Sequence, residues 1–227
     1  MRQIAGILLV IVAVATLLIA CSDDKSTTPT PPAVVVPSDS LQAVYAFTSD
    51  ASDGSGAGNH GTLLGTAAAS DSLVLNNNSV DGLDLPHGVL NGLGDFTVSV
   101  WMRVLVVHAS ANMFISGATA ANANAFGIWY WNTNDSWVMT INSNNYLYPA
   151  DTTIIDQTWH HLAFVREGDS NSVYVDGVLI GAPVPVPSAA LTVDAGGLIV
   201  GQDQDLVGGE FDASQCLAGN LDNLRIY

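Results

Sequence analysis

Basic side chains are scarce in this sequence. Five Lys and Arg face 21 Asp and Glu, which gives a net charge of −16, and only Arg103, Arg166 and Arg225 follow residue 40. A nucleic-acid-binding protein needs a basic surface, so that class is excluded. Anionic ligands are repelled as well, unless a bound cation lies between them and the protein.

Cysteine is nearly absent: the chain has two, Cys21 and Cys216. Cys21 follows a nearly unbroken apolar run over 4–20, behind a short basic start, which is typical of a secretory signal. The run ends in "LIAC", which resembles the lipobox of bacterial lipoproteins and implies cleavage before Cys21 and its acylation. The alternative is a plain uncleaved anchor. If Cys21 is acylated, no disulfide can form within the chain, and the fold depends on its core or on bound metal.

The sequence divides into three segments on this interpretation. We expect a lipoprotein signal peptide over 1–20, an acylated cysteine with a Pro/Thr/Ser-rich tether over 21–38, and one folded domain over 39–227. The expected location is the bacterial cell envelope, with a lipid anchor in the outer membrane and the domain surface-exposed or periplasmic.

Long helical patterns are missing after residue 40, and short runs alternate between apolar and polar residues instead. In "DFTVSVWMRV" (95–104), one face carries Phe96, Val98, Val100 and Met102. "SVYVDGVLIG" (172–181) is a hairpin by its turn chemistry, since Asp-Gly suits a two-residue type I′ turn. Further strands are predicted at "FGIWYW", "SWVMTI", "TWHHLAFVRE", "GGLIVG" and "LAGNLDNLRIY". Strands at this spacing predict an all-β fold, a two-sheet antiparallel sandwich.

The segment 201–215, "GQDQDLVGGEFDASQ", concentrates carboxylates without any positive charge. Asp203-x-Asp205 places two carboxylates on one side of an extended segment, and the following glycine pair lets the chain return with Asp212 and Gln215. Calcium prefers such hard oxygen donors, and the lack of His and Cys argues against zinc. A solvated polar turn has the same composition, so both interpretations stay open on these residues alone.

Several stretches together resemble a known family. "AVYAFTSDASDGSGAGNHGTLLG", "DFTVSVWMRV", "TWHHLAFVREGDSNSVYVDGVLIG" and "GNLDNLRIY" resemble the laminin-G-like and pentraxin-like branch of the concanavalin A-like lectin/glucanase superfamily, over nearly all of 41–227. The resemblance implies a jelly-roll sandwich.

The resemblance extends to the acidic segment, whose spacing is similar to the calcium-binding loop of pentraxins. It implies calcium ligands at Asp203, Gln204 (through its backbone carbonyl), Asp205, Asp212 and Gln215. An Asp-Asn pair in an earlier loop of the family corresponds to "AANANAF" here, which offers Asn122 and Asn124 but no aspartate. That departure concerns the first of the family's two calcium positions.

Aromatic residues are the remaining candidates for ligand contact. Trp137, Tyr146 and Tyr148 flank Asn-rich turns, so we expect an exposed platform for sugar rings. Trp129 and Trp131 share one strand face and Tyr130 takes the other; at least one of these faces is expected to lie in the core. Neighbouring His160 and His161 point to opposite faces of a strand and are not expected to chelate a metal.

The function predicted from the sequence is a non-catalytic, calcium-dependent binding module that recognises carbohydrate, or a phosphate- or carboxylate-bearing group bridged by calcium. A protein-binding or adhesive sandwich without metal is the alternative. A glycoside hydrolase of the same superfamily is less favoured, because the paired-carboxylate strand motif of the family's glucanases is missing and the chain has only two glutamates, Glu167 and Glu210.

Overall fold

The computed structural model describes residues 40–149 and 152–227. The expected signal peptide, Cys21 and tether lie outside these residues. The described residues form an antiparallel sandwich of two sheets, with only short 3-10 helices, η1 (His87–Val89), η2 (Asn132–Asn134) and η3 (Thr152–Ile155), between the strands. This confirms the predicted fold class. No helix in the described part of the chain is long and apolar enough to span a membrane.

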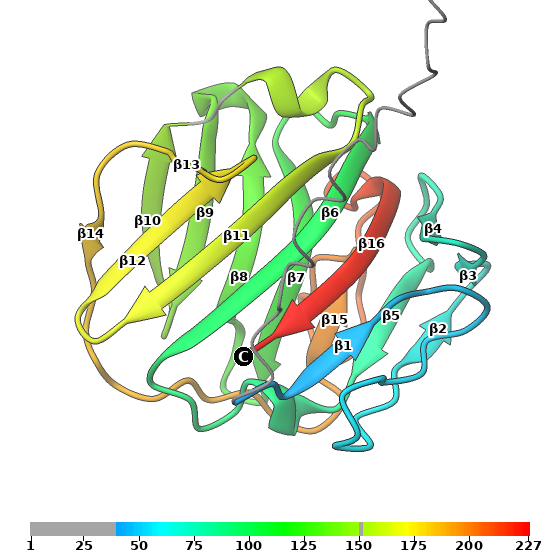
Figure 1. The fold of residues 1–227 in the computed structure, drawn as a ribbon, viewed down its shortest axis with the longest axis horizontal. Coiled ribbons are helices and arrows are strands. Elements are labelled where there is room, and N and C mark those ends of the chain that lie inside the picture. The colour runs from blue at the N-terminus through cyan, green and yellow to red at the C-terminus, as the bar shows by residue number, and fades with distance from the viewer. Residues whose placement is uncertain (1–39, 150–151) are drawn as a thin grey trace, which may run out of the picture. The chain divides into compact units, whose positions relative to one another are not determined.

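One layer, sheet A, contains both the first strand and the last strand of the domain. Its order is β13-β12-β11-β6-β16-β4-β3, with β1 added against β16 and β14 against β12. Figure 1 shows β12, β11, β6 and β16 running side by side across the front of the domain. The strands are β1 (Ala43–Tyr45), β3 (Ala68–Ala69), β4 (Leu73–Leu75), β6 (Phe96–Val106), β11 (His160–Glu167), β12 (Ser170–Val175), β13 (Val178–Leu179), β14 (Val184–Pro185) and β16 (Ala218–Ile226).

The second layer, sheet B, has the order β10-β9-β8-β7-β15-β5-β2. It lies behind sheet A in Figure 1. Its strands are β2 (Thr62–Leu64), β5 (Gly82–Leu85), β7 (Ala111–Thr119), β8 (Asn122–Trp131), β9 (Ser136–Ile141), β10 (Asn144–Pro149) and β15 (Leu198–Val200).

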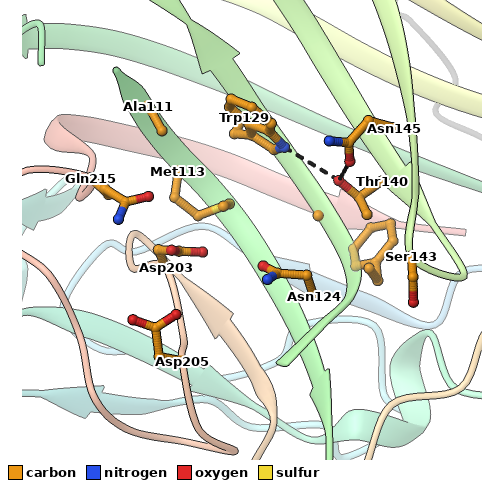
Figure 2. A pocket seen from close by; sticks show the side chains of 12 residues that line it. Ala111, Met113, Asn124, Trp129, Thr140, Ser143, Asn145, Asp203, Asp205 and Gln215 are labelled. Atoms are coloured by element: carbon orange, nitrogen blue, oxygen red, sulfur yellow. Dashed lines mark hydrogen bonds between the residues drawn. The ribbon is translucent and has the colours of Figure 1, made fainter. Parts of the chain in front are cut away.

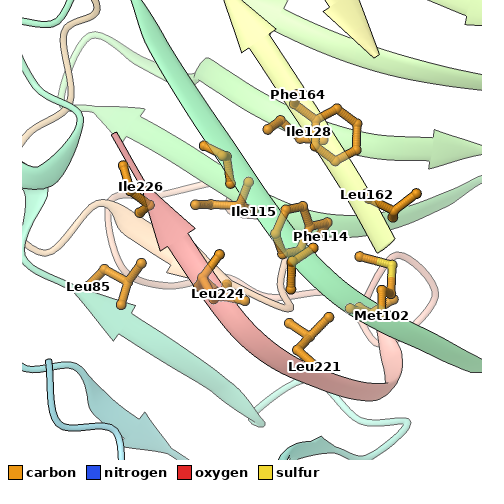
Figure 3. Packing of buried hydrophobic residues seen from close by; sticks show 14 of the residues in the cluster. Leu85, Met102, Phe114, Ile115, Ile128, Leu162, Phe164, Leu221, Leu224 and Ile226 are labelled. Atoms are coloured by element: carbon orange, nitrogen blue, oxygen red, sulfur yellow. The ribbon is translucent and has the colours of Figure 1, made fainter. Parts of the chain in front are cut away.

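The core fills the space between the sheets, as the alternation in the sequence predicts. Phe96, Val98, Val100 and Met102 of β6 are all buried. Figure 3 shows the middle of this core, where Phe114 of β7 and Phe164 of β11 meet across the sheets, with ring centroids 6.0 Å apart. Both sheets contribute apolar residues to this layer, and side chains that point the other way lie on the outer faces of the sandwich. On sheet B some of these outer side chains, such as Val138 and Ile199, are buried as well.

The predicted hairpin forms between β12 and β13. Asp176 and Gly177 have φ angles of 49° and 80°, the positive values that a type I′ turn needs. The Asp176 carboxylate also accepts a hydrogen bond from the backbone N–H of His161 at 2.8 Å and lies 2.7 Å from Nδ1 of His160. Asp156 lies 3.3 Å from Nε2 of the same imidazole. These contacts tie His160 and the backbone of His161 to the adjacent turns.

These two histidines predict opposite pH trends in stability. Burial lowers the pKa of His160, but Asp176 and Asp156 outweigh it, so the pKa is raised; burial lowers the pKa of His161. A raised pKa adds stability that is complete below about pH 6.5 and is lost as pH rises through the folded-state value. We expect His160→Gln to lower the melting temperature more at pH 6 than at pH 9, and His161→Gln to show the reverse trend. Equal effects at both pH values would contradict this assignment.

Candidate functional site

A pocket of about 490 Å³ lies over the outward face of sheet B. On β8, Gly127 and Trp129 alternate with the core residues Ile128 and Tyr130, so they point away from sheet A. Figure 2 shows Asp203, Asp205 and Gln215 on one side of this pocket, Asn124 near the end of β8, and Trp129, Thr140 and Asn145 on the far side. The acidic segment and the polar ends of three strands therefore share one hollow.

The acidic segment begins where β15 ends. Gly201 has a φ of 90°, and its N–H donates to the carbonyl of Phe114 at 2.8 Å while its own carbonyl accepts from Leu217 at 2.9 Å. A residue with a side chain rarely adopts this φ, so the glycine lets the chain leave the sheet at once. Asp203 and Asp205 consequently project beside the outward face of β7 rather than continuing the strand.

The buried side chain of Gln204 ties the acidic segment to the neighbouring strand and loop by hydrogen bonds. Its amide nitrogen donates to the carbonyl of Ser116 at 3.2 Å, the hydroxyl of Ser116 at 2.7 Å and the carbonyl of Gly197 at 3.0 Å, and its amide oxygen accepts from the N–H of Gly208 at 2.8 Å. The side chain is fully buried, and both its amide nitrogen and its amide oxygen are engaged inside the protein. Only the backbone of Gln204 is left to reach a cation, as the resemblance implies.

The carboxylates on either side of Gln204 differ in environment. Asp205 is exposed, whereas Asp203 is 8% exposed. Burial, followed by the charges of Asp205 and Asp212, raises the pKa of Asp203 to about 6. A buried carboxylate that is kept near other negative charges is stabilised in its ionised form by a cation.

The other predicted ligands are only partly brought together. Gln215 and Asn124 line the pocket with Asp203 and Asp205. Asp212 is exposed and accepts a hydrogen bond from the N–H of Ser214 at 2.8 Å. It does not line the pocket, although its negative charge contributes to the raised pKa of Asp203. Asn122 does not line it either; its amide nitrogen donates to Ser143 and its amide oxygen accepts from the N–H of Asn124.

The donor set decides which cation fits. No group of three or more His, Cys, Asp or Glu side chains in the described ranges is arranged to hold a metal ion. A cation at Asp203 and Asp205 would therefore need amide oxygens of Gln215 or Asn124, backbone carbonyls or water to complete its shell. Calcium accepts such a mixed oxygen shell, whereas zinc sites rely on His and Cys. The residues present fit calcium.

On the far wall of the pocket, Thr140 and Asn145 were not predicted from the sequence, which left open whether the face of Trp129 lies in the core. Trp129 Nε1 donates to the hydroxyl of Thr140 at 3.3 Å, and that hydroxyl bonds to Asn145 at 2.8 Å. Trp129 also packs on Trp131, with ring centroids 5.7 Å apart. This row of one aromatic ring and polar groups across β8, β9 and β10 can contact a sugar ring by stacking and by hydrogen bonds.

The predicted aromatic platform is wrong. Trp137 and Tyr148 are 1% and 0% exposed, and Tyr146 is half-buried against the core. Trp137 packs on Phe164 of the opposite sheet, with centroids 5.1 Å apart. The reason is the strand alternation: Trp137, Met139 and Ile141 share the inward face of β9, and Tyr148 is paired with Trp137. The Asn-rich turns beside them reach solvent, but these rings do not.

Comparison with known proteins agrees with this architecture. A family model described as concanavalin A-like lectin/glucanases superfamily matches residues 77–227. C-reactive protein 3.3 of Limulus polyphemus is 30% identical over 151 residues, which are 62% of this chain and 59% of that protein; the chain thus spans less than two thirds of this relative.

Two solved structures show the same fold. The first is domain 4 of AbnA, an extracellular arabinanase from Geobacillus stearothermophilus, in complex with arabinotriose. It is 24% identical with a TM-score of 0.52, covering 82% of this chain and 91% of that one. The second, a Trypanosoma rangeli sialidase in complex with sialic acid, is 15% identical with a TM-score of 0.62, covering 85% and 31%. At these identities the likeness concerns the fold alone.

Proposed function

Because the chain belongs to the concanavalin A-like lectin/glucanases superfamily, we propose that its sandwich is a non-catalytic binding module whose ligand site is the pocket over sheet B. The ligand class is carbohydrate, or an anionic group bridged by calcium. The observation that carries the proposal is the buried carboxylate of Asp203 beside Asp205, in a pocket whose opposite wall presents Trp129. Calcium at Asp203 would supply the positive charge that a protein of net charge −16 otherwise lacks for binding anions.

Three sets of residues have distinct proposed roles in this pocket. Asp203 and Asp205, with Gln215 and Asn124 nearby, would hold calcium, and Gln204 fixes the spacing of the two carboxylates from inside. Trp129 offers an apolar face to a sugar ring, while Thr140 and Asn145 offer hydrogen bonds to its hydroxyls. Specificity then depends on the turn between β9 and β10, which contributes Ser143.

An array of glycans and phosphate- or carboxylate-bearing ligands, probed with and without calcium, tests the proposal. We expect binding that a chelator abolishes and that Asp205→Asn and Trp129→Ala each reduce about tenfold, which corresponds to about 1.4 kcal/mol, because one variant removes a metal ligand and the other removes the stacking surface. Trp101→Ala is the matched control, because Trp101 is an exposed tryptophan on sheet A. Binding unchanged in both pocket variants would overturn the assignment.

A glycoside hydrolase is the competing function, because two carboxylates in one pocket are also what hydrolysis requires. Neither Glu167, at the end of β11 in sheet A, nor Glu210 lines this pocket. Release of sugar from a panel of β-glucans by the wild type, lost in Asp203→Asn and Asp205→Asn, would replace the binding module with an enzyme. A ligand retained without turnover supports the module.

We also propose that this module is displayed from the bacterial envelope by a lipid on Cys21. The apolar run over 4–20 and the following "LIAC" support this. Mass spectrometry of the mature N-terminus tests it: a diacylated or triacylated cysteine is expected, and an intact Met1 would reject the anchor.

A further inference from the structure

Four polar side chains are buried together between the sheets, where β9 and β10 face β11 and β12. Trp137, Tyr148, Arg166 and Asn171, here named the interior donor cluster, are each no more than 1% exposed. None of them lines the pocket over sheet B. The cluster is therefore a second polar region, separate from the proposed ligand site.

Strand pairing brings these four residues together. Trp137 is directly opposite Tyr148 in the β9–β10 pair, and Arg166 is directly opposite Asn171 in the β11–β12 pair. Opposite residues have Cβ atoms about 4.5–5.5 Å apart. Between the sheets, burial raises the pKa of Tyr148, and the side chain of Asn171, within hydrogen-bonding reach of the Tyr148 hydroxyl, opposes that rise. Trp137 in turn packs on Phe164, two residues from Arg166 on the same strand face.

Most of the hydrogen-bonding atoms in the cluster have no partner within the described protein. By hydrogen-bond geometry the unpartnered atoms are Trp137 Nε1, Tyr148 Oη, Arg166 Nε and Nη1, and Asn171 Nδ2 and Oδ1. Asn171 lies within reach of the Tyr148 hydroxyl, but a bond between these two would still leave the donors of Trp137 and Arg166 without an acceptor. Five of these six atoms are donors when the tyrosine hydroxyl is counted among them, and only the amide and hydroxyl oxygens accept. Such an excess of buried donors calls for an acceptor that the protein does not supply.

The positive charge of Arg166 also lacks an anionic partner among the described residues. Its Nη2 donates to the carbonyls of Pro187 and Ala189 at 2.5 and 2.7 Å, which leaves the rest of the guanidinium without a partner. No carboxylate of the described residues lies within ion-pair distance of it. Burial lowers the pKa of Arg166 and the more distant Asp95 opposes this. An uncompensated buried cation costs several kcal/mol, and a small anion removes that cost.

We propose that the interior donor cluster binds a small monovalent anion of the chloride class between the two sheets. A halide accepts hydrogen bonds from several directions at once, so it suits donors from four strands. The near-complete burial of all four side chains excludes a larger anion with its own substituents. The proposal is independent of the pocket over sheet B and of calcium.

The test compares melting temperatures in sodium chloride and sodium gluconate at equal ionic strength, with a chelator present. We expect chloride to raise the melting temperature of the wild type by about 5–10 °C at a hundredfold excess over its dissociation constant. Tyr148→Phe keeps the ring and removes one donor, so it should weaken the chloride response. Arg166→Met should abolish that response, while Arg225→Met, on β16 and bonded to Asn223, is the matched control and should keep it.

A crystal of the wild type grown with bromide gives a second readout that does not depend on any variant. We expect an anomalous peak within hydrogen-bonding distance of Arg166 and Asn171. Identical melting curves in chloride and gluconate, together with no bromide peak at the cluster, would overturn the proposal and assign these donors to buried water instead.

Discussion

In calcium-free buffer at pH 8, Asp203→Asn should raise the melting temperature of the domain, and in millimolar calcium acetate it should lower it relative to the wild type. The wild-type carboxyl has its pKa raised to about 6 by burial and by Asp205. Ionising it therefore costs stability above that pH, and asparagine avoids the cost. With calcium bound, the same charge becomes a ligand, and the wild type gains about 2.7 kcal/mol at a hundredfold excess over the dissociation constant.

The pH dependence and the control variants test whether this reversal between calcium-free and calcium-containing buffer comes from Asp203. At pH 4 and below the carboxyl is largely protonated in the folded state, so the calcium-free difference should shrink. Asp205→Asn should also lose most of the calcium response, whereas Glu210→Gln, which does not line the pocket, should keep it. Magnesium should substitute poorly because it demands a smaller octahedral shell. If millimolar calcium does not change the wild-type melting temperature, the segment is a solvated turn and not a calcium site.

Gln204→Glu should be the most damaging single-atom change in the acidic segment. The substitution places a carboxylate oxygen where the amide nitrogen now donates to the carbonyls of Ser116 and Gly197. The two carbonyl oxygens then face a buried negative charge and lose their donor, so we expect a loss of about 3–5 kcal/mol in the free energy of unfolding. Calcium binding should fall as well, although this side chain contacts no cation, because the segment loses its internal support.

Urea unfolding of Gln204→Glu, with Gln157→Glu as the exposed matched control, measures this loss. The control should change stability by less than about 0.5 kcal/mol. A Gln204→Glu protein as stable as the wild type would show that the segment is not held from inside and would remove the reason for the spacing of Asp203 and Asp205.

The sandwich was predictable because its signals are local. Alternation in 95–104 and the Asp176-Gly177 turn each fix a strand face or a register without knowledge of the partner strand. The same rule was available for "SWVMTI", where Trp137 shares its face with Met139 and Ile141. The Asn-rich turns on either side of that segment reach solvent, but a turn does not fix which face a strand residue takes, so the prediction of an exposed tryptophan is wrong.

The pocket was less accessible to sequence reasoning because it joins segments far apart in the chain. Asp203 and Asp205 were identified by spacing, but Thr140 and Asn145 enter the pocket through the pairing of β8, β9 and β10. Single polar residues on a strand carry no local sign of what they face. The unpartnered state of Arg166 is likewise a property of the packed interior, where burial and strand register together decide which donors find an acceptor.

The pairing of β1 with β16 has a consequence for how this domain can be joined to other chains. Ala43 is paired with Ile226, so the first and last strands of the sandwich leave the fold as neighbours. A unit whose two ends emerge side by side can be spliced into a loop of a host protein, or have its ends joined and be reopened elsewhere. The exposed Asp176-Gly177 turn offers such an opening, on an edge of sheet A, while the pocket over sheet B is left intact.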